Sequence, residues 1–446
     1  MPSKAHCIVL LLLLVFLHEA AGLKTAKKKP APPAKKPGYG KTPVKGNGDS
    51  AIFDVLSYGA KGDGVTDDTK AFMAAWQAAC SVESAQIVIP SEFRFLVGPI
   101  TFSGPCQPNI IFQIEGTIIA PTNARIWGSG LLQWMQFIKL KGITIQGCGV
   151  IDGQGSVWWD VSDGSYELSS RKTKSARMPS IKPTALRFYG SFDVTVQGIT
   201  IQNSAQCHLK LDSCTSAKIF NVTISSPCES PNTDGIHLQN SEDIEIHHST
   251  MACGDDCVSI QTGCADIRVH NINCGPGHGI SIGGLGKDQT KACVSNITVY
   301  DSYISDALNG VRIKTWQGGV GSVKGVSFSN IEVSNVRVPI VIDQFYCDKR
   351  LCRNQTAAVA IAGVKYEKIR GTYVTKAAHL ACSDNVPCTD VTLTGIELEP
   401  VAKILQQPFC WKTYGETETP TIPPIYCLHS GNPFKNGRVQ SHRDSC

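Results

Sequence analysis

The sequence predicts an all-β protein that folds as a parallel β-helix, a solenoid of stacked coils, with one helix at its N-terminal end. Two observations lead to this fold. Short segments of alternating apolar and polar residues recur between Gly, Asn, Asp and Ser, as strands do between turns. The segments also repeat at a nearly regular interval, which indicates that each coil buries its apolar residues against the neighbouring coils.

Composition agrees with a large folded domain. The chain has 446 residues, of which 42% are hydrophobic and 18% charged. The net charge of +5 is unevenly distributed, because eight lysines and no acidic residue lie between Lys24 and Lys45. Subtracting these eight charges from +5 leaves −3 for the remainder of the chain. The folded part therefore has the wrong sign for a nucleic-acid-binding protein, and we expect no nucleic-acid partner.

Residues 1–22 are typical of a secretory signal peptide. Lys4 precedes an uninterrupted apolar run from Cys7 to Leu17, and small residues follow, so we expect cleavage near Gly22. The run is too short to span a membrane, and an uncleaved anchor is the alternative interpretation. We therefore predict a secreted, extracellular protein without a membrane contact after cleavage.

Cysteine usage agrees with an oxidising compartment. The sequence has 19 cysteines, and removal of Cys7 with the signal peptide leaves an even number. Three sequons, which begin at Asn221, Asn296 and Asn354, are potential N-glycosylation sites in a secreted chain.

Residues 23–49 form a tract rich in Lys, Pro and Gly that lacks the apolar residues of a core. We expect this tract to be a disordered linker. Two interpretations of its charge remain open: a solvated spacer, or a polycation that binds an acidic polymer outside the cell. The β-helix domain then occupies residues 50–446.

The clearest helical pattern lies between Asp67 and Cys80, with Thr66 as the candidate N-cap. Apolar residues recur on one face at helical spacing, namely Ala71, Phe72, Ala75, Trp76 and Ala79. We expect this helix to cover the N-terminal end of the coil stack, which would otherwise expose the core and unpaired strand edges.

The strand segments align in two series. In one series the first apolar residues are Leu209, Ile236, Val258, Ile280, Val311 and Ile340. The second series falls between them and contains Val194, Ala217, Ile244 and Ile267. One coil of about 22 residues, with occasional loop insertions, explains both series.

Acidic residues and a histidine occupy equivalent positions of successive coils. Asp234, Asp256 and His278 each stand two residues before an aligned apolar residue, and Asp255 is adjacent. Equivalent positions of stacked strands lie about 4.8 Å apart. Residues far apart in the sequence therefore converge on one outer stripe.

The following coils add cationic and aromatic residues to the stripe. Arg312 and Lys314 are two positions apart in one strand and point to the same face, and Gln344 and Tyr346 follow one coil later. Three close carboxylates repel one another, so at least one should be held protonated near neutral pH. Glycoside hydrolysis uses one acid to protonate the leaving oxygen and one carboxylate to activate water. Because Arg and Lys can hold a substrate carboxylate, the stripe suggests an acidic polysaccharide as substrate.

Each of these residues has a simpler interpretation when it is taken alone. A single Asp is most often a turn residue, and Gly277-His278-Gly279 could be a tight turn. Asp234 and Asp256 could also hold calcium. The shared register of all these groups favours a catalytic site over the separate explanations.

Four motifs carry a resemblance to a known family. They are Asn232-Thr233-Asp234-Gly235, Gly254-Asp255-Asp256-Cys257, Gly277-His278-Gly279-Ile280 and Arg312-Ile313-Lys314. In this order they resemble the signature motifs of the polygalacturonases, a glycoside hydrolase family of right-handed parallel β-helices. Segments 54–69 and 149–159 are also similar to plant members. The resemblance covers roughly residues 52–430 and implies the right-handed sense of the coils.

The resemblance implies a catalytic role for four residues. Asp255 matches the general acid, Asp234 and Asp256 match the pair that positions and activates water, and His278 matches the residue that supports the acid's protonation. We expect the repulsive carboxylate neighbour of Asp255 to raise its pKa. The implied reaction is inverting hydrolysis of the α-1,4-galacturonosyl bonds of homogalacturonan in plant cell wall remodelling. The resemblance implies no catalytic metal, and we expect a monomer without a cofactor.

The resemblance also implies the substrate contacts, which are Arg312, Lys314, Tyr346 and Asn232. The inverting outcome rests on the resemblance alone. The stack spacing by itself would bring the carboxylates to about 5 Å, which is the separation in retaining enzymes.

Two other functions compete with an active hydrolase. A catalytically silent pectin-binding wall protein should have lost an acid, and none is missing here. A pectate lyase would use calcium and an arginine base, whereas the acid pair and Gly277-His278-Gly279 favour the hydrolase.

Four disulfide expectations complete the sequence-based picture. A Cys257–Cys274 bridge between neighbouring coils would hold Asp256 and His278 in place. We expect short-loop bridges for Cys347–Cys352 and Cys382–Cys388. Cys253 and Cys264 flank the second motif and suggest a further local disulfide.

Overall fold

The computed structural model describes residues 44–45, 51–159, 178–348, 351–402, 406–431, 433 and 446. The predicted signal peptide (1–22) and the predicted linker up to residue 43 lie outside the described residues. Within the predicted linker, a short strand β1 (Val44–Lys45) pairs antiparallel with β2 (Ala51–Asp54). In the described ranges no helix is both long enough and apolar enough to cross a membrane.

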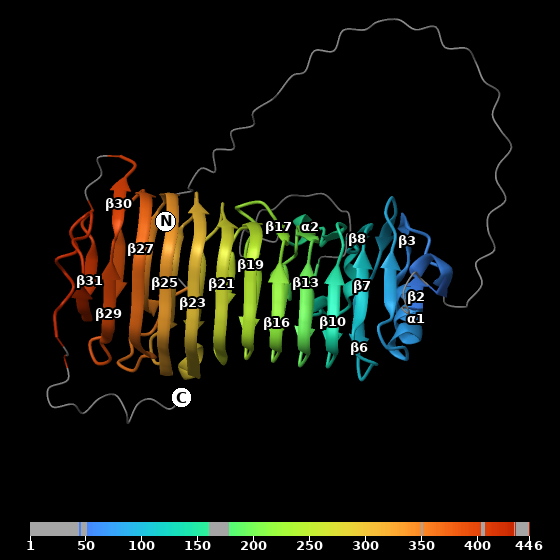
Figure 1. Ribbon diagram of the computed structural model, residues 1–446, viewed down its shortest axis with the longest axis horizontal. Coiled ribbons are helices and arrows are strands. Elements are labelled where there is room, and N and C mark those ends of the chain that lie inside the picture. Colours follow the sequence, from blue (N-terminus) through green and yellow to red (C-terminus); the bar gives the residue numbers. More distant parts are fainter. Residues whose placement is uncertain are drawn as a thin grey trace, which may run out of the picture. The chain divides into compact units, whose positions relative to one another are not determined.

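The described residues from β2 onward form a parallel β-helix, in which strands of successive coils lie side by side (Figure 1). One sheet of 11 described strands, called sheet B here, carries one face of the coils. Its strands are β6 (Ile100–Ser103), β9 (Gln133–Ile138), β12 (Thr184–Tyr189), β15 (Leu209–Asp212), β18 (Ile236–Gln239), β20 (Val258–Ile260), β22 (Ile280–Leu285), β24 (Asn309–Trp316), β26 (Val338–Tyr346), β28 (Ala378–Ala381) and β31 (Phe409–Trp411).

The second sheet, sheet A, contains 21 described strands and bends around the remaining faces of the coils. Besides β1 and β2, its strands are β3 (Asp63–Asp67), β4 (Gln86–Ile89), β5 (Arg94–Leu96), β7 (Ile110–Ile114), β8 (Thr117–Ile119), β10 (Lys141–Gln146), β11 (Val150–Asp152), β13 (Phe192–Gln197), β14 (Thr200–Gln202), β16 (Thr215–Phe220), β17 (Thr223–Ser225), β19 (Glu242–Ala252), β21 (Cys264–Cys274), β23 (Lys291–Ser305), β25 (Val320–Val336), β27 (Ala360–Tyr373), β29 (Cys388–Thr394), β30 (Glu397–Pro400) and β32 (Thr413–Thr417).

The strand register confirms both predicted series. In sheet B the first series pairs in chain order, that is Leu209 with Ile236, then Val258, Ile280, Val311 and Ile340. In sheet A the second series pairs Val194 with Ala217, Ile244 and Ile267. The apolar members of each coil therefore stack directly on those of the next.

The stacked apolar side chains form the core. Phe102, Phe137 and Phe188 lie on successive strands of sheet B, with ring centroids 4.8 and 5.3 Å apart along the ladder. Leu209, Ile236 and their partners along the series are likewise fully buried. Because every coil buries its apolar residues against two neighbours, only the two ends of the stack need a cover.

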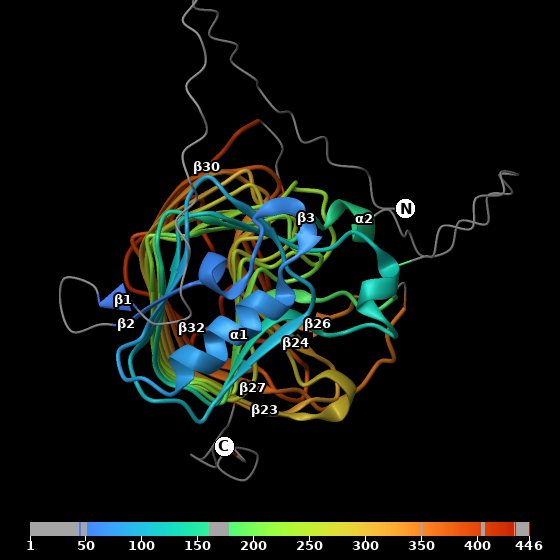
Figure 2. The same cartoon turned by 90° about the vertical axis from the view of Figure 1, so that its right-hand side faces the viewer.

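Helix α1 (Thr69–Cys80) provides that cover at the N-terminal end, where it crosses the first coils (Figure 2). Its buried residues are the five that were predicted, namely Ala71, Phe72, Ala75, Trp76 and Ala79. The Trp76 ring packs 5.1 Å from Phe102, at the first strand of sheet B. The remaining helical elements are short: α2 (Ser156–Trp159), η1 (Val55–Tyr58), η2 (Ala124–Trp127) and η3 (Lys287–Gln289).

The predicted start of the helix is wrong. Thr66 belongs to β3, and its side chain bonds to Asp63 instead of capping the helix. The N-cap residue is Asp68, which makes no capping hydrogen bond because its carboxylate accepts from the backbone amides of Lys61 and Gly62. Asp68 therefore closes the loop that precedes the helix.

Three of the four disulfide predictions are confirmed: Cys257–Cys274, Cys347–Cys352 and Cys382–Cys388. The structure adds Cys80–Cys106, Cys293–Cys446 and Cys410–Cys427.

The expected local disulfide of Cys253 and Cys264 is wrong, because both are free and buried. Cys253 precedes β20 and its thiol donates to the carbonyl oxygen of Asp255, whereas Cys264 begins β21 beyond the other end of β20. The length of β20 keeps the two thiols apart.

Candidate active site

The site lies where successive strands of sheet B begin. Asp234 precedes β18, Asp255 and Asp256 precede β20, and His278 precedes β22. Backbone hydrogen bonds join these turns, since the amide of Gly235 donates to the carbonyl oxygen of Asp256 over 2.9 Å. The turns are therefore held in the same register as the strands that they precede.

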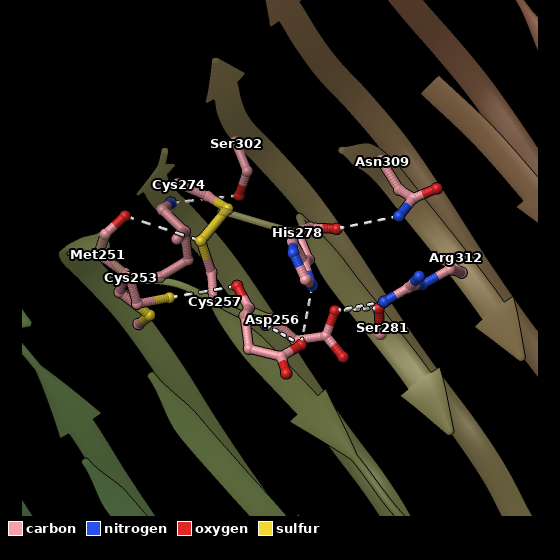
Figure 3. The surroundings of a disulfide bond; sticks show 12 residues. Met251, Cys253, Asp256, Cys257, Cys274, His278, Ser281, Ser302, Asn309 and Arg312 are labelled. Carbon is pink, nitrogen blue, oxygen red and sulfur yellow. Dashed lines mark hydrogen bonds and ion pairs between the residues drawn. A yellow bond between two sulfur atoms is a disulfide. The ribbon is translucent and has the colours of Figure 1, made fainter. Parts of the chain in front are cut away.

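Asp256 is the most enclosed carboxylate of the site, with only 1% of its surface exposed. Its Oδ1 accepts hydrogen bonds from Arg312 Nη2 and Ser281 Oγ, both over 2.7 Å, and its Oδ2 accepts one from Lys314 Nζ over 2.8 Å. Figure 3 shows Asp256 facing Ser281 and Arg312 on the neighbouring strands. Such pairing is what a buried charge requires, so Asp256 is held as a fixed carboxylate.

Asp255 faces a histidine and an amide. His278 Nδ1 lies 3.0 Å from Asp255 Oδ1, and Asn232 Nδ2 donates to Asp255 Oδ2 over 3.2 Å. The backbone amide of Asp256 also donates to Asp255 Oδ1. Donors to both oxygens favour the ionised form of this carboxylate.

The charge state of Asp255 differs from the sequence-based expectation. A repulsive carboxylate neighbour was expected to raise its pKa, and burial does act in that direction. The hydrogen bond and charge of His278, together with the charges of Lys314 and Arg312, outweigh burial and lower the pKa of Asp255 to about 2. The expectation is therefore wrong for the protein without substrate.

The pKa of Asp234 is shifted upwards, in the opposite direction to that of Asp255. Burial raises the pKa of Asp234, a hydrogen bond from His237 opposes this, and the negative charge of Asp255 adds to the rise. His237 Nδ1 lies 3.3 Å from Asp234 Oδ2. Repulsion from Asp255 thus acts on Asp234 in the direction that the sequence predicts for one acid of the cluster.

The predicted substrate contacts are brought to the same face. Arg312 and Lys314 extend from β24, where they bind Asp256 and remain about one-tenth exposed. Asn232 contacts Asp255, and Tyr346 ends β26 with its ring centroid 5.2 Å from Lys314 Nζ. All eight predicted site residues therefore lie within one network on the outer face of sheet B.

Sequence reasoning missed three members of this network. His237, Ser281 and Trp316 contact Asp234, Asp256 and Tyr346 respectively. Strand alternation could have found His237 and Ser281, because each follows an aligned apolar residue and so points outward. Trp316 carried no comparable signal, since its contact depends on a register shift between β24 and β26.

Asp255, Asp256 and His278 offer ligand atoms that all lie within 4.8 Å of one another, which is a spacing that could hold a metal ion. Both oxygens of Asp256, however, already accept hydrogen bonds from cationic side chains. Arg312 and Lys314 thus supply the positive charge that a metal would otherwise bring to this carboxylate.

A groove continues from the site towards the C-terminal coils. Its volume is about 350 Å³, and it is lined in part by Asn309 and Arg312 of β24 and by Arg337, Lys376 and His379 of the following coils. An extended ligand could therefore pass from the carboxylates along the outer face of sheet B.

Fold and site together define a carbohydrate-cleaving enzyme, since paired carboxylates and cations line an open face of a β-helix. The sequence profile of the Glycosyl hydrolases family 28 matches residues 80–408. The chain belongs to this family and is a glycoside hydrolase.

Related sequences agree with this assignment. A probable polygalacturonase of Arabidopsis thaliana is 42% identical over 395 residues, which cover 87% of each chain. A polygalacturonase of Cryptomeria japonica is 43% identical over 350 residues, which cover 78% of this chain and 67% of that protein.

Solved structures agree on the fold. Endo-xylogalacturonan hydrolase from Aspergillus tubingensis superposes with a TM-score of 0.69 at 23% identity, covering 80% of this chain and 95% of that one. Polygalacturonase from Erwinia carotovora superposes with a TM-score of 0.63 at 24% identity, covering 84% and 99% respectively. These relatives confirm the predicted right-handed parallel β-helix.

Proposed function

We propose that the protein is a secreted polygalacturonase that hydrolyses α-1,4-galacturonosyl linkages of homogalacturonan during plant cell wall remodelling. The observation that carries this proposal is the network of Asp255 with His278 and of Asp256 with Arg312 and Lys314, on the open face of sheet B. The relatives named polygalacturonase supply the bond and the substrate class.

Asp255 acts as the general acid in this proposal, although it is ionised without substrate. A substrate carboxylate bound by Arg312 and Lys314 would offset two of the charges that lower the pKa of Asp255, and it would add a negative charge nearby. Both changes favour a proton on Asp255. Substrate binding thus prepares the acid for the leaving oxygen.

Asp234 acts as the base towards water, with Asp256 as its partner in positioning that water. Asp256 is a poor nucleophile because its two oxygens already accept hydrogen bonds from Arg312, Ser281 and Lys314. The pKa of Asp234, by contrast, is raised, and burial is the main cause. A carboxylate with a raised pKa is a stronger base and so accepts a proton from water more readily. These features support attack by water and inversion over a covalent sugar intermediate on Asp256.

Reducing-sugar release from polygalacturonate tests the activity. The purified protein should release reducing ends, and Asp255→Asn should lose about 100-fold or more of its turnover while circular dichroism remains that of the wild type. Asp193→Asn is a matched control, because Asp193 is exposed on the other sheet. A folded Asp255→Asn protein with near-normal turnover would refute the role, and inactive wild-type protein would favour the silent pectin-binding alternative.

Three further measurements test the finer parts of the proposal. Proton NMR during cleavage should show the β-anomer of the new reducing end first if the enzyme inverts, and the α-anomer first if it retains configuration. N-terminal sequencing of the protein collected from the medium of a eukaryotic expression host should begin near residue 23, and an intact Met1 would contradict the signal peptide. Gel filtration should give a mass close to the monomer's 48.0 kDa less the signal peptide.

A further inference from the structure

We propose that the outer face of sheet B has a second carbohydrate-binding site at β28 and β31, which holds a distal part of the same acidic polysaccharide chain. This distal platform consists of His379, Phe409 and Trp411 with Lys376 and Lys412. The proposal rests on the proposed function, because it takes the same substrate class and extends the active site along the coil axis.

The strand register places the platform in line with the active site. Arg312 pairs with Val341, which pairs with His379 and then with Phe409. Because the platform's last strand lies three strand steps beyond β24, the two sites are separated by about 14 Å along the stack. A single extended polymer can therefore contact both.

A second run of paired residues lies beside the first and ends in Trp411. Lys314 pairs with Asp343, then Ala381, then Trp411. The run that begins at Arg312 thus ends at Phe409, and the run that begins at Lys314 ends at Trp411. Both aromatic rings lie on the same face of the sheet.

The aromatic rings of the platform are exposed and held in place. Phe409 is 41% and Trp411 47% exposed, although the core of the coils is closed and apolar. The His379 and Phe409 rings stack with centroids 5.1 Å apart, and the Trp411 indole N–H donates to Asp384 over 3.0 Å. The Cys410–Cys427 disulfide ties the strand between the two rings to a following segment. Exposed rings held in a fixed orientation offer a flat apolar surface for the face of a sugar ring.

Lysines accompany both rings. Lys376 Nζ lies 5.9 Å from the centre of the Phe409 ring, and Lys412 Nζ lies 5.9 Å from the centre of the Trp411 ring. A galacturonate residue has an apolar ring face and a carboxylate at its edge. A ring beside an ammonium group matches both features, so the platform favours acidic over neutral sugars.

A charged groove joins the platform to the active site. The 350 Å³ groove contains the cations Arg312, Arg337 and Lys376, with His379 at its wall. The His379 ring stacks on Phe409, and burial lowers the pKa of its imidazole. Asp343 lies on β26 between the two sites, and burial raises the pKa of its carboxyl. The groove therefore keeps a positive character along its length.

Dependence on substrate length tests the platform. The quantity to measure is the ratio of two kcat/KM values, one on polygalacturonate and one on the shortest oligogalacturonate that the wild type cleaves. This ratio should fall roughly tenfold in the double variant Phe409→Ala/Trp411→Ala, because only the polymer reaches β31. Lys376→Gln should lower the same ratio, and more strongly at low salt. Phe192→Ala is the matched aromatic control, with Phe192 48% exposed on β13, and Lys365→Gln on β27 is the matched charge control.

The possible outcomes separate this proposal from the proposed function. An unchanged ratio in folded platform variants, with wild-type protein active, would overturn the platform and leave the polygalacturonase proposal intact. If the wild type does not cleave polygalacturonate, affinity electrophoresis in gels containing polygalacturonate still decides. Weaker retardation of the platform variants than of the two controls would support the platform, and equal retardation would overturn it.

Discussion

Replacing Asp255 and replacing Asp234 by asparagine should change the stability of the folded protein in opposite directions. The two carboxylates belong to one site, yet their surroundings act oppositely on them. His278, Lys314 and Arg312 lower the pKa of Asp255 against the effect of burial, whereas burial, with repulsion from Asp255, raises the pKa of Asp234.

The magnitude for Asp255 follows from its pKa. A value of about 2 against the ordinary 3.8 corresponds to about 2 kcal/mol in favour of the folded state. A carboxyl whose pKa is lowered on folding stabilises the protein fully above its unfolded-state pKa and loses this contribution as the pH falls through the folded-state pKa. Asp255→Asn should therefore cost up to about 2 kcal/mol above about pH 4, and the cost should disappear between about pH 4 and about pH 2.

The sign is reversed for Asp234. A carboxyl whose pKa is raised on folding destabilises the protein once the pH rises through the unfolded-state pKa towards the folded-state pKa. Asp234→Asn removes this buried charge while its amide oxygen can still accept from His237, so the variant should be more stable than the wild type at neutral pH. Both variants should lose activity.

Urea unfolding, followed by circular dichroism and tryptophan fluorescence across this pH range, measures both effects. Coincident transitions from the two probes are needed, because stacked coils can unfold in parts. Asp193→Asn again serves as the control. An Asp255→Asn protein that is more stable than the wild type at neutral pH, or an Asp234→Asn protein that is less stable, would refute the assignment of charges in this site.

Three other changes test separate features. Arg312→Gln should destabilise the protein by up to about 3 kcal/mol in thermal unfolding, because it leaves the buried charge of Asp256 with one cation fewer; no loss would show that this pairing is weak. Replacing Cys257 and Cys274 together by alanine should lower the free energy of unfolding by about 3 kcal/mol, as expected for a loop of this length. It should also lower kcat, because the disulfide holds the turns that carry the carboxylates. An equally stable and active variant would contradict this role. Deleting the predicted linker 23–49 should weaken salt-sensitive retention on immobilised polygalacturonate with little change in turnover on short oligomers, and unchanged retention would return the tract to a plain spacer.

The fold could be predicted because a solenoid repeats its information. The same alternation of apolar and polar residues occurs in every coil, so an incorrectly aligned segment would have interrupted a regular series. Val258 and Ile280 could therefore be aligned from the sequence alone. The start of α1 was harder, since Thr66 was the predicted N-cap and the structure places the N-cap at Asp68. Their competing bonds to Asp63 and to the loop amides are settled only in three dimensions.

The residues of the site could be predicted, but their electrostatics could not. Equivalent positions in the repeat gave Asp234, Asp256 and His278, yet sequence gives no measure of how deeply each carboxylate is buried or which donor reaches it. The pKa of Asp255 depends on His278 standing 3.0 Å away rather than on the carboxylate next to it in the chain. The bonds from Arg312 and Lys314 to Asp256 were hidden for the same reason.

The unequal coil lengths have a consequence for engineering this scaffold. From β18 to β20 the aligned positions differ by 22 residues, and from β22 to β24 by 31, yet the aligned apolar residues pair directly in both cases. The extra residues are therefore accommodated in the connections and do not shift the strands. Foreign loops could be grafted at the longer connections to reshape the rim of the substrate groove, while the carboxylates remain in place on the coils.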